Sequence, residues 1–287
     1  MVARHLPVFL TSLVVLLLLW AYPPEASGQP ITLVTLGDSL TDGDGDETPI
    51  GGYPPRLLTS LLPAHPGSVL NNLGTSGHTT TDLINIQLDQ AVAALNAAPA
   101  THSKIALVWI GSNDLFGFYN YTAQQDWCVD MGLDACEASE FAQSADNVNT
   151  ILSRLKATGA SIFIALLDDQ SRRPVITEPG LRASSFPNIT DAYAARMSTQ
   201  VGVYNSRVQT HAATHGARTV DFFHTTIFEN WATLSPDGNH PNAAGYDAIT
   251  TIWFNAVSGA APPPPPPPPP AAGRNLAPVL HLLRDGD

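Results

Sequence analysis

A serine after an apolar run and a distant Asp-x-x-His motif are the residues of this chain best suited to chemistry. Ser39 lies in a Gly-Asp-Ser-Leu tetrad that directly follows the β-branched run Ile31–Leu36, and such a run predicts a buried strand. Asp237 and His240 lie three residues apart, far downstream. A serine hydroxyl becomes a nucleophile when a histidine accepts its proton, and a carboxylate commonly orients that histidine. These residues therefore predict a Ser-His-Asp triad and acyl transfer from an ester.

Four short blocks follow one another along the chain: Gly37-Asp38-Ser39-Leu40, Asn72-Leu73-Gly74, Gly111-Ser112-Asn113-Asp114 and Asp237-Gly238-Asn239-His240-Pro241. Together they resemble the signature of the GDSL or SGNH hydrolase family. The resemblance implies that Ser39 is the nucleophile, His240 the general base and then the general acid, and Asp237 the residue that orients the imidazole. It also implies an oxyanion hole made by the amides of Ser39 and Gly74 and the side chain of Asn113. Gly74 has no Cβ to hold its backbone away from substrate, and an asparagine amide donates without titrating.

Taken singly, these motifs have ordinary structural explanations. A serine at a strand end often caps a helix, and Asn-Asp and Asp-Gly pairs are typical of turns. All four blocks, placed in order after alternating strands, favour catalysis. We expect the Asp38 carboxylate to bind neighbouring backbone amides, and the sequence assigns no role to Asp114.

The elements that must position these residues alternate between strands and helices. This alternation predicts an α/β class protein, a three-layer α/β/α, flavodoxin-like domain with a five-stranded parallel sheet, and ligands bind at the carboxyl strand ends of such sheets. Two long connections, Leu115–Cys136 and Asp168–Thr190, follow strands and are expected to overhang the site, their aromatic residues either binding substrate or packing onto the domain. The predicted strands are Ile31–Leu36, Val69–Leu73, Ile105–Ile110, Ser161–Leu167 and Arg218–Phe222. The predicted helices are Pro55–Leu62, Thr81–Asn96, Ala138–Ala157, Asp191–His215 and Ala243–Val257.

The chain divides into four expected parts. Residues 1–28 resemble a signal peptide, with Arg4 before an apolar stretch and small residues at its end, which predicts a secreted protein. The alternative is a membrane anchor, but the apolar stretch has about 15 residues and a bilayer span needs roughly 20, so we expect no stable anchor. Residues 29–259 form the hydrolase domain and 260–272 a proline-rich linker of polyproline II type. Residues 273–287 are a short tail, either disordered or the start of a truncated second module.

Export makes two further patterns interpretable. Cys128 and Cys136 are the only cysteines, and in an oxidising compartment they are expected to form a disulfide rather than two separate buried thiols. Asn120 and Asn188 lie in N-glycosylation triplets, which carry meaning only in an organism that glycosylates them.

Composition and spacing argue against several other classes of function. The net charge of −12 disfavours nucleic acid, whose phosphates the chain would repel. Asp42, Asp44 and Asp46 alternate as in a calcium loop, but the glycine and glutamate that complete an EF-hand are missing. His211 and His215 have a zinc-compatible spacing without the glutamate of a metalloprotease motif. We therefore expect no metal site and no cofactor, and a monomer.

The expected substrate is a carboxylic ester, but the sequence leaves its alcohol and acyl parts open. Export and a proline linker suit the removal of O-acetyl groups from carbohydrates. The aromatic-rich connections, and the resemblance to lysophospholipase-like members of the family, suit short-chain or lysophospholipid-type esters. The alternative from another class of protein is a non-catalytic carbohydrate-binding surface protein that retains the fold.

Overall fold

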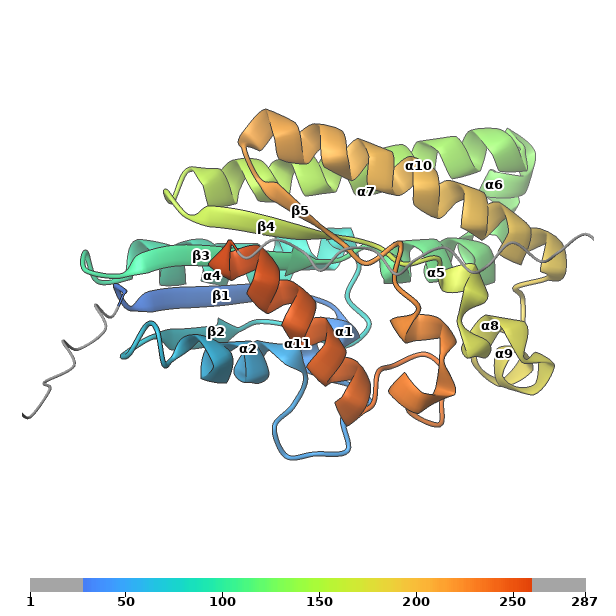
Figure 1. Ribbon diagram of the computed structural model, residues 1–287. Coiled ribbons are helices and arrows are strands. Elements are labelled where there is room, and N and C mark those ends of the chain that lie inside the picture. Colours follow the sequence, from blue (N-terminus) through green and yellow to red (C-terminus); the bar gives the residue numbers. More distant parts are fainter. Residues whose placement is uncertain (1–27, 260–287) are drawn as a thin grey trace, which may run out of the picture.

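The sheet of this protein has five parallel strands in the order β2-β1-β3-β4-β5 (Figure 1). The computed structural model describes residues 28–259. The predicted linker, the tail and all but the last residue of the predicted signal peptide lie outside these residues. The strand order is the flavodoxin-like one, and the predicted fold is confirmed. The strands are β1 (Ile31–Gly37), β2 (Val69–Asn72), β3 (Ser103–Trp109), β4 (Ser161–Leu166) and β5 (Arg218–Asp221).

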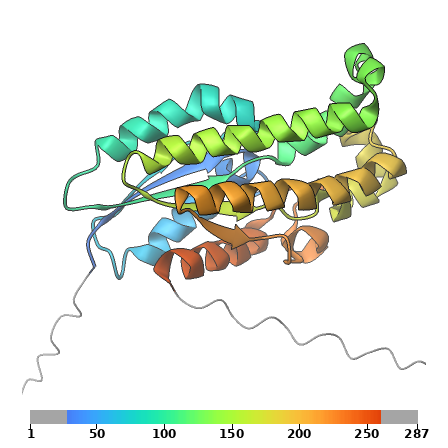
Figure 2. The ribbon, with the colours of Figure 1, turned by 90° about the horizontal axis from the view of Figure 1, so that it is seen from above.

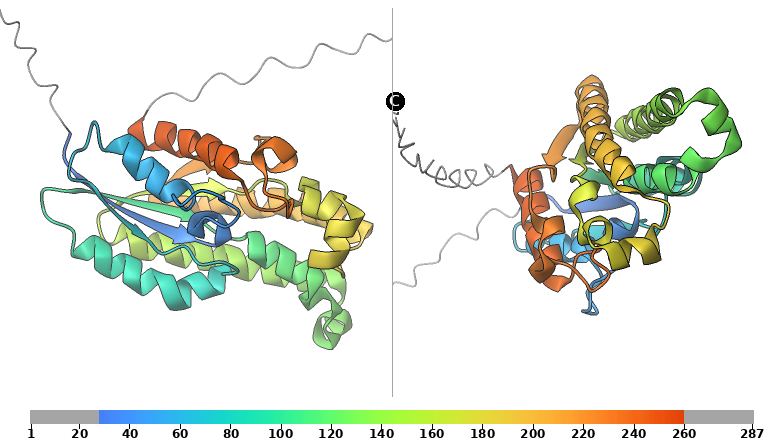
Figure 3. Two further views of the ribbon diagram at one scale, coloured as in Figure 1. Left: turned by 90° about the horizontal axis from the view of Figure 1, so that it is seen from below. Right: turned by 90° about the vertical axis from the view of Figure 1, so that its right-hand side faces the viewer.

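Helices cover both faces of the sheet (Figures 2 and 3). One face carries α2 (Tyr53–Leu61) and α11 (Ala243–Ser258), which pack against each other. The other carries α4 (Leu88–Asn96), α7 (Leu133–Lys156) and α10 (Asp191–His215). Within residues 28–259, no helix has the length and apolarity that a bilayer span needs.

The ends of α10 show why some boundaries can be read from sequence. The Thr190 hydroxyl accepts a hydrogen bond from the Tyr193 amide at the start of the helix, and Gly216 ends it with a φ of 66°. A threonine N-cap and a left-handed glycine are strong local signals. The helix therefore has the predicted bounds.

The hydrophobic core lies on both faces of the sheet, around β1 and β3. All seven residues of β1 are buried, as expected for a parallel strand covered on two sides. Under α11 the indole of Trp109 stacks on Phe222 with ring centroids 4.1 Å apart, and Trp253 stacks on Tyr53 at 5.6 Å. This aromatic layer supports the end of β3, directly before the Gly-Ser-Asn-Asp block.

The two long connections are mostly helical, unlike irregular loops. The first contains α5 (Ser112–Asn120), a 3₁₀ turn, η2 (Thr122–Gln124), and α6 (Asp126–Met131), and α7 begins at Leu133, five residues before its predicted start. The second contains η3 (Gln170–Arg172), α8 (Pro174–Thr177) and α9 (Pro179–Ser185). Figure 1 shows these short helices gathered at one end of the sheet, beyond the carboxyl ends of the strands.

The aromatic residues of the first connection divide into two groups. Phe116, Phe118 and Tyr119 are buried and pack the connection onto the domain, whereas Tyr121 and Trp127 are exposed. A disulfide joins Cys128 and Cys136 and ties α6 to the first turns of α7. Both explanations of the aromatic residues therefore apply, each to a different part of the connection.

One of the two glycosylation triplets is closed to modification in the folded protein. Asn120 is fully buried, and its side-chain oxygen accepts a hydrogen bond from the Asn188 amide at 3.1 Å. Asn188 is exposed, but its own side-chain nitrogen donates to the Asn120 carbonyl at 2.7 Å. In this structure the pair joins the end of α5 to the segment that precedes α10.

Candidate active site

Ser39 lies on a tight turn between β1 and the short helix α1 (Ser39–Asp42). Asp38 caps the helix, because its Oδ1 accepts a hydrogen bond from the Leu40 amide at 3.1 Å. Ser39 is the first helical residue, so its amide is one of the N–H groups that a helix leaves without an internal partner. Its side chain is almost buried, with 8% of the residue exposed. The turn therefore presents a hydroxyl and an amide without an intrahelical partner at the strand end.

The Asp-x-x-His turn places an imidazole against this serine. His240 Nε2 lies 2.9 Å from Ser39 Oγ, and His240 Nδ1 lies 2.6 Å from Asp237 Oδ2. An ionised carboxylate only accepts hydrogen bonds. In the neutral imidazole Nδ1 therefore carries the proton, and Nε2 is left as an acceptor for the serine hydroxyl.

Asp237 organises its own turn as well as the imidazole. Its Oδ1 accepts hydrogen bonds from the amides of Asn239 and His240 at 2.8 and 2.9 Å and from the Ser235 hydroxyl at 2.7 Å. Partial burial favours the neutral acid, but the hydrogen bonds from the side chain and backbone of His240 and from Asn239 hold the pKa of Asp237 well below its usual range. The carboxylate therefore stays ionised beside the imidazole.

Asn113 and Gly74 reach the same end of the sheet from different elements. Asn113 lies in the first turn of α5, where its Nδ2 donates to the His78 carbonyl at 3.0 Å. One of its two amide hydrogens is thereby used and the other is left for a ligand. The Gly74 amide donates to Asn72 Oδ1 at 3.1 Å, so a ligand must compete for it.

The structure shows a packing reason for a glycine at position 74. A Cβ at Gly74 would lie 2.5 Å from the amide nitrogen of Asp42 and from the carbonyl carbon of Thr41. The missing side chain lets the backbone approach α1 closely. Asn72 completes this contact, because its Nδ2 donates to the Thr41 carbonyl at 3.0 Å.

A buried ion pair that the sequence analysis missed holds the histidine turn. Arg173 donates to the two oxygens of Asp168 at 2.8 and 2.7 Å, and its third nitrogen donates to Asn239 Oδ1 at 2.8 Å. The guanidinium also lies over the Phe228 ring, 4.5 Å from its centroid. Asp168 directly follows a predicted strand and Arg173 comes five residues later, but nothing in this local pattern indicates Asn239 as a partner.

Asp38 and Asp114 carry buried carboxylates with different degrees of compensation. The Oδ2 of Asp38 has no hydrogen-bond partner among the described residues, and burial raises the pKa of Asp38 to about 7. Asp114 is better satisfied. It accepts hydrogen bonds from the Thr80 amide and hydroxyl and from the Ser144 hydroxyl, which fasten the start of α5 to α3 (Thr80–Asp82) and α7.

Two of the residues considered for metal binding have other partners. Asp46 accepts hydrogen bonds from Arg56 and from the Gly52 amide. His215 Nε2 lies 2.7 Å from Asn149 Oδ1. Among residues 28–259, no group of three or more His, Cys, Asp or Glu side chains has an arrangement that could hold a metal ion.

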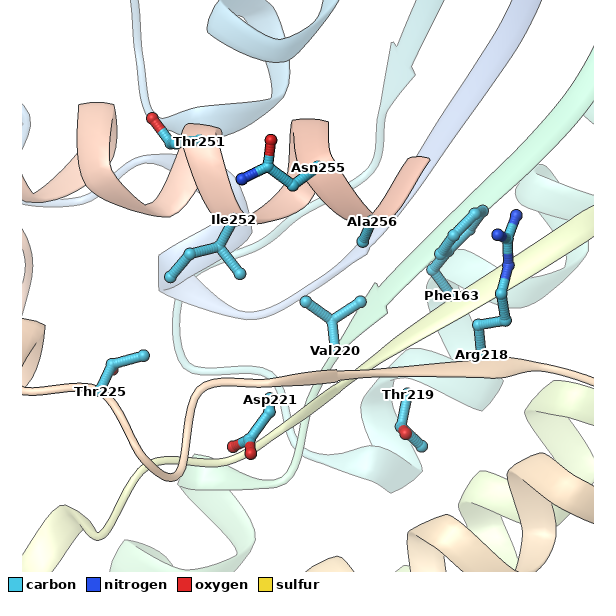
Figure 4. Close-up of a pocket in the computed structure, with 10 residues that line it drawn as sticks. All are labelled: Phe163, Arg218, Thr219, Val220, Asp221, Thr225, Thr251, Ile252, Asn255 and Ala256. Carbon is cyan, nitrogen blue, oxygen red and sulfur yellow. The ribbon is translucent and has the colours of Figure 1, made fainter. Parts of the chain in front are cut away.

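One large cavity has none of the proposed catalytic or oxyanion-hole residues in its lining. It has a volume of about 490 Å³ and lies between β5 and α11, where Val220 and Ile252 project into it (Figure 4). A smaller cavity of about 180 Å³ includes Asn113 in its lining. Its other lining side chains are mostly polar, among them Thr79, Thr122 and Gln143.

Known proteins match this chain over most of the described region. The model of the GDSL-like lipase/acylhydrolase family matches residues 35–248. The α/β hydrolase LAE5 from the metagenome of Lake Arreo, Spain, is 25% identical, with a TM-score of 0.54 over 81% of this chain and 96% of that one. The acetylxylan esterase Axe2 from Geobacillus stearothermophilus is 21% identical, with a TM-score of 0.53 over 80% and 95%. The psychrotrophic esterase EstA from Pseudoalteromonas sp. is 18% identical, with a TM-score of 0.51 over 79% and 97%. The search of curated proteins found no match.

Proposed function

The chain belongs to the GDSL-like lipase/acylhydrolase family and is a carboxylic ester hydrolase, and we propose that Ser39 is its nucleophile. The observation that carries the proposal is the continuous hydrogen-bond chain from Ser39 Oγ through His240 to Asp237, with links of 2.9 and 2.6 Å. The protein is therefore an ester hydrolase and not the non-catalytic carbohydrate-binding protein considered as the alternative.

The proposed reaction has two halves, acylation of Ser39 and hydrolysis of the acyl-serine, and in each half His240 accepts a proton and then donates it. Its Nε2 accepts the Ser39 proton as Oγ attacks the ester carbonyl carbon, and then gives that proton to the departing alcohol, which leaves an acyl-serine. A water molecule next gives a proton to Nε2 and attacks the acyl carbon, and the same proton returns to Ser39 Oγ as the acid leaves. Asp237 stabilises the imidazolium in both halves because its carboxylate remains ionised.

The oxyanion that forms in each half needs donors that are already in place. We assign this role to the Ser39 amide, the free Asn113 amide hydrogen and the Gly74 amide. The first two are supported by their unused hydrogen-bonding capacity, whereas Gly74 must release Asn72. A single donor of this kind contributes about 3 kcal/mol to the transition state.

For the substrate we propose short acyl esters, above all O-acetyl groups, on a hydroxyl-rich alcohol such as a carbohydrate. The structural likeness to the acetylxylan esterase Axe2 supports this choice. Lysophospholipid-type esters are the second candidate, favoured by the exposed Tyr121 and Trp127 on the first long connection. We further propose secretion, on the strength of the residues 1–28 that resemble a signal peptide.

Hydrolysis of a short-chain p-nitrophenyl ester by the wild type and Ser39→Ala tests the nucleophile. We expect Ser39→Ala to lower kcat by on the order of 10³-fold or more with an unchanged circular dichroism spectrum, and EDTA to leave the wild-type rate unchanged. A folded and active Ser39→Ala variant would refute the assignment of Ser39 as the nucleophile. Rates on acetylated xylan, esters of graded chain length and lysophospholipid then rank the substrate classes.

A further inference from the structure

Gln87 is a buried glutamine that the proposed mechanism does not use. It ends a π-helical turn, η1 (Leu83–Gln87), between α3 and α4, and only 1% of the residue is exposed. Its Oε1 accepts a hydrogen bond from the Gly37 amide at 2.9 Å, and its Nε2 donates to the Gly37 carbonyl at 2.8 Å. Gly37 is the last residue of β1, two positions before Ser39. One side chain therefore holds both backbone groups at the entrance to the nucleophile turn.

The second amide hydrogen of Gln87 connects this turn to the loop of His78. Gln87 Nε2 lies 2.9 Å from His78 Nδ1. Because an amide nitrogen only donates, His78 Nδ1 must be the acceptor, and both hydrogens and the oxygen of Gln87 are then used. The carbonyl of His78 in turn accepts the hydrogen bond from the Asn113 side chain at 3.0 Å. Gly37 and Asn113 are thus connected by hydrogen bonds through the Gln87 side chain and through His78, whose side chain and carbonyl each form one of these bonds.

The end of β1 at Gly37 is closely packed against its neighbours. A Cβ at Gly37 would lie 2.3 Å from the Trp109 carbonyl oxygen and 2.2 Å from Thr41 Oγ1, so the end of β1 is packed on two sides. The π-helical turn widens the helix by one residue per hydrogen bond, and such turns are frequent at functional sites. Here the turn places Gln87 opposite Gly37, across a sequence separation of 50 residues.

We propose that Gln87 is a positioning residue, which holds Ser39 and Asn113 in the relative placement that lets their donors meet one oxyanion. The inference rests on the proposed roles of Ser39 and Asn113. Gln87 acts on Ser39 through Gly37 and on Asn113 through His78. Its contribution is therefore expected in kcat rather than in KM, since it touches no substrate and aligns groups used most strongly in the transition state.

The test is a double-mutant cycle on kcat with Gln87→Met and Asn113→Ala. Gln87→Met keeps the length of the side chain and removes all three hydrogen bonds, and we expect kcat to fall on the order of 10–100-fold, as for small misplacements of reacting groups, with KM nearly unchanged. In the Asn113→Ala background the same change is expected to have a much smaller effect. An equal fold-change in both backgrounds would overturn the inference, because two independent roles add in free energy.

A matched control is available three residues away. Gln90 in α4 is exposed and its side chain donates to the Ile86 carbonyl in η1, so Gln90→Met makes the same chemical change without altering the hydrogen bonds of Gln87. If Gln87→Met does not fold, His78→Leu serves instead, because it changes a half-buried side chain and removes only the acceptor of the second Gln87 hydrogen, leaving both bonds to Gly37. Wild-type kcat in His78→Leu would then overturn the link from Gln87 to Asn113. Gln87 variants with the kcat of Gln90→Met refute the positioning role alone. An active Ser39→Ala variant refutes the proposed function instead.

Discussion

Replacement of Arg173 by methionine is expected to destabilise the fold and to slow the reaction, through two contacts that can be separated. The side chains of Arg173 and Asp168 are 2% and 4% exposed, so Arg173→Met leaves a buried carboxylate without its counter-ion. Breaking a buried pair in this way costs about 3–5 kcal/mol. The same change removes the hydrogen bond to Asn239, the neighbour of His240, and we expect kcat to fall on the order of 10-fold as the imidazole loses its alignment.

The double variant Asp168→Asn/Arg173→Met distinguishes these effects. Neutralising both partners removes the uncompensated buried charge, which is the main cost of breaking a buried pair from one side. Urea unfolding should therefore show most of the stability restored, while kcat stays low because Asn239 still lacks its donor. Arg154→Met is the control, since the Arg154–Asp89 pair is exposed and such pairs contribute about 0–1 kcal/mol. Wild-type kcat in the double variant would refute the alignment argument, and an unchanged unfolding midpoint for Arg173→Met would refute the burial argument.

Three further predictions concern the oxyanion hole, the disulfide and the buried acid. Asn113→Ala should lower kcat more than it raises KM, and steady-state kinetics in which only KM changes would make Asn113 a ground-state binding residue. Cys128→Ser/Cys136→Ser should lower the free energy of unfolding by about 2 kcal/mol, while mass spectrometry of the non-reduced wild type should find the bridge. Burial raises the pKa of Asp38 to about 7, so between about pH 4 and 7 the native state still holds a proton that the unfolded chain has lost. The free energy of unfolding of the wild type therefore falls as the pH rises through this range and levels off above it. Asp38→Asn, which does not titrate, should therefore gain about 2–3 kcal/mol on the wild type between pH 5 and 8, and a pH-independent difference in denaturant unfolding would contradict the assigned pKa.

The fold could be predicted because its local signals agree with its tertiary structure. All of β1 is buried and its sequence is a short run of mostly apolar and β-branched residues, and α10 carries its caps in its own sequence. Agreement was weaker where tertiary contacts decide the outcome. The start of α7 was missed because Leu133–Glu137 lacks the apolar spacing of the rest of the helix and is held instead by the disulfide and by the Arg196–Glu137 ion pair.

The proposed triad could be predicted because each half is local. Asp237 binds two amides and the imidazole within one turn, and the Asp38 cap lies beside Ser39, so both halves leave short motifs in the sequence. Only the distance between the halves, 2.9 Å from Ser39 Oγ to His240 Nε2, needs the structure.

The residues that hold these motifs in place leave no such trace, and the reason is physical. Gln87, Arg173 and Asp168 are buried polar side chains, and in a sequence they look like residues of a solvated helix face or loop. Burying a polar side chain is costly unless it forms hydrogen bonds, and each of these side chains has hydrogen-bond partners in the folded protein. Two of those partners, Gly37 for Gln87 and Asn239 for Arg173, lie 50 and 66 residues away. The motifs therefore indicate the proposed chemistry, whereas its alignment depends on contacts that exist only once the sheet has brought the ends of β1 and β4 together.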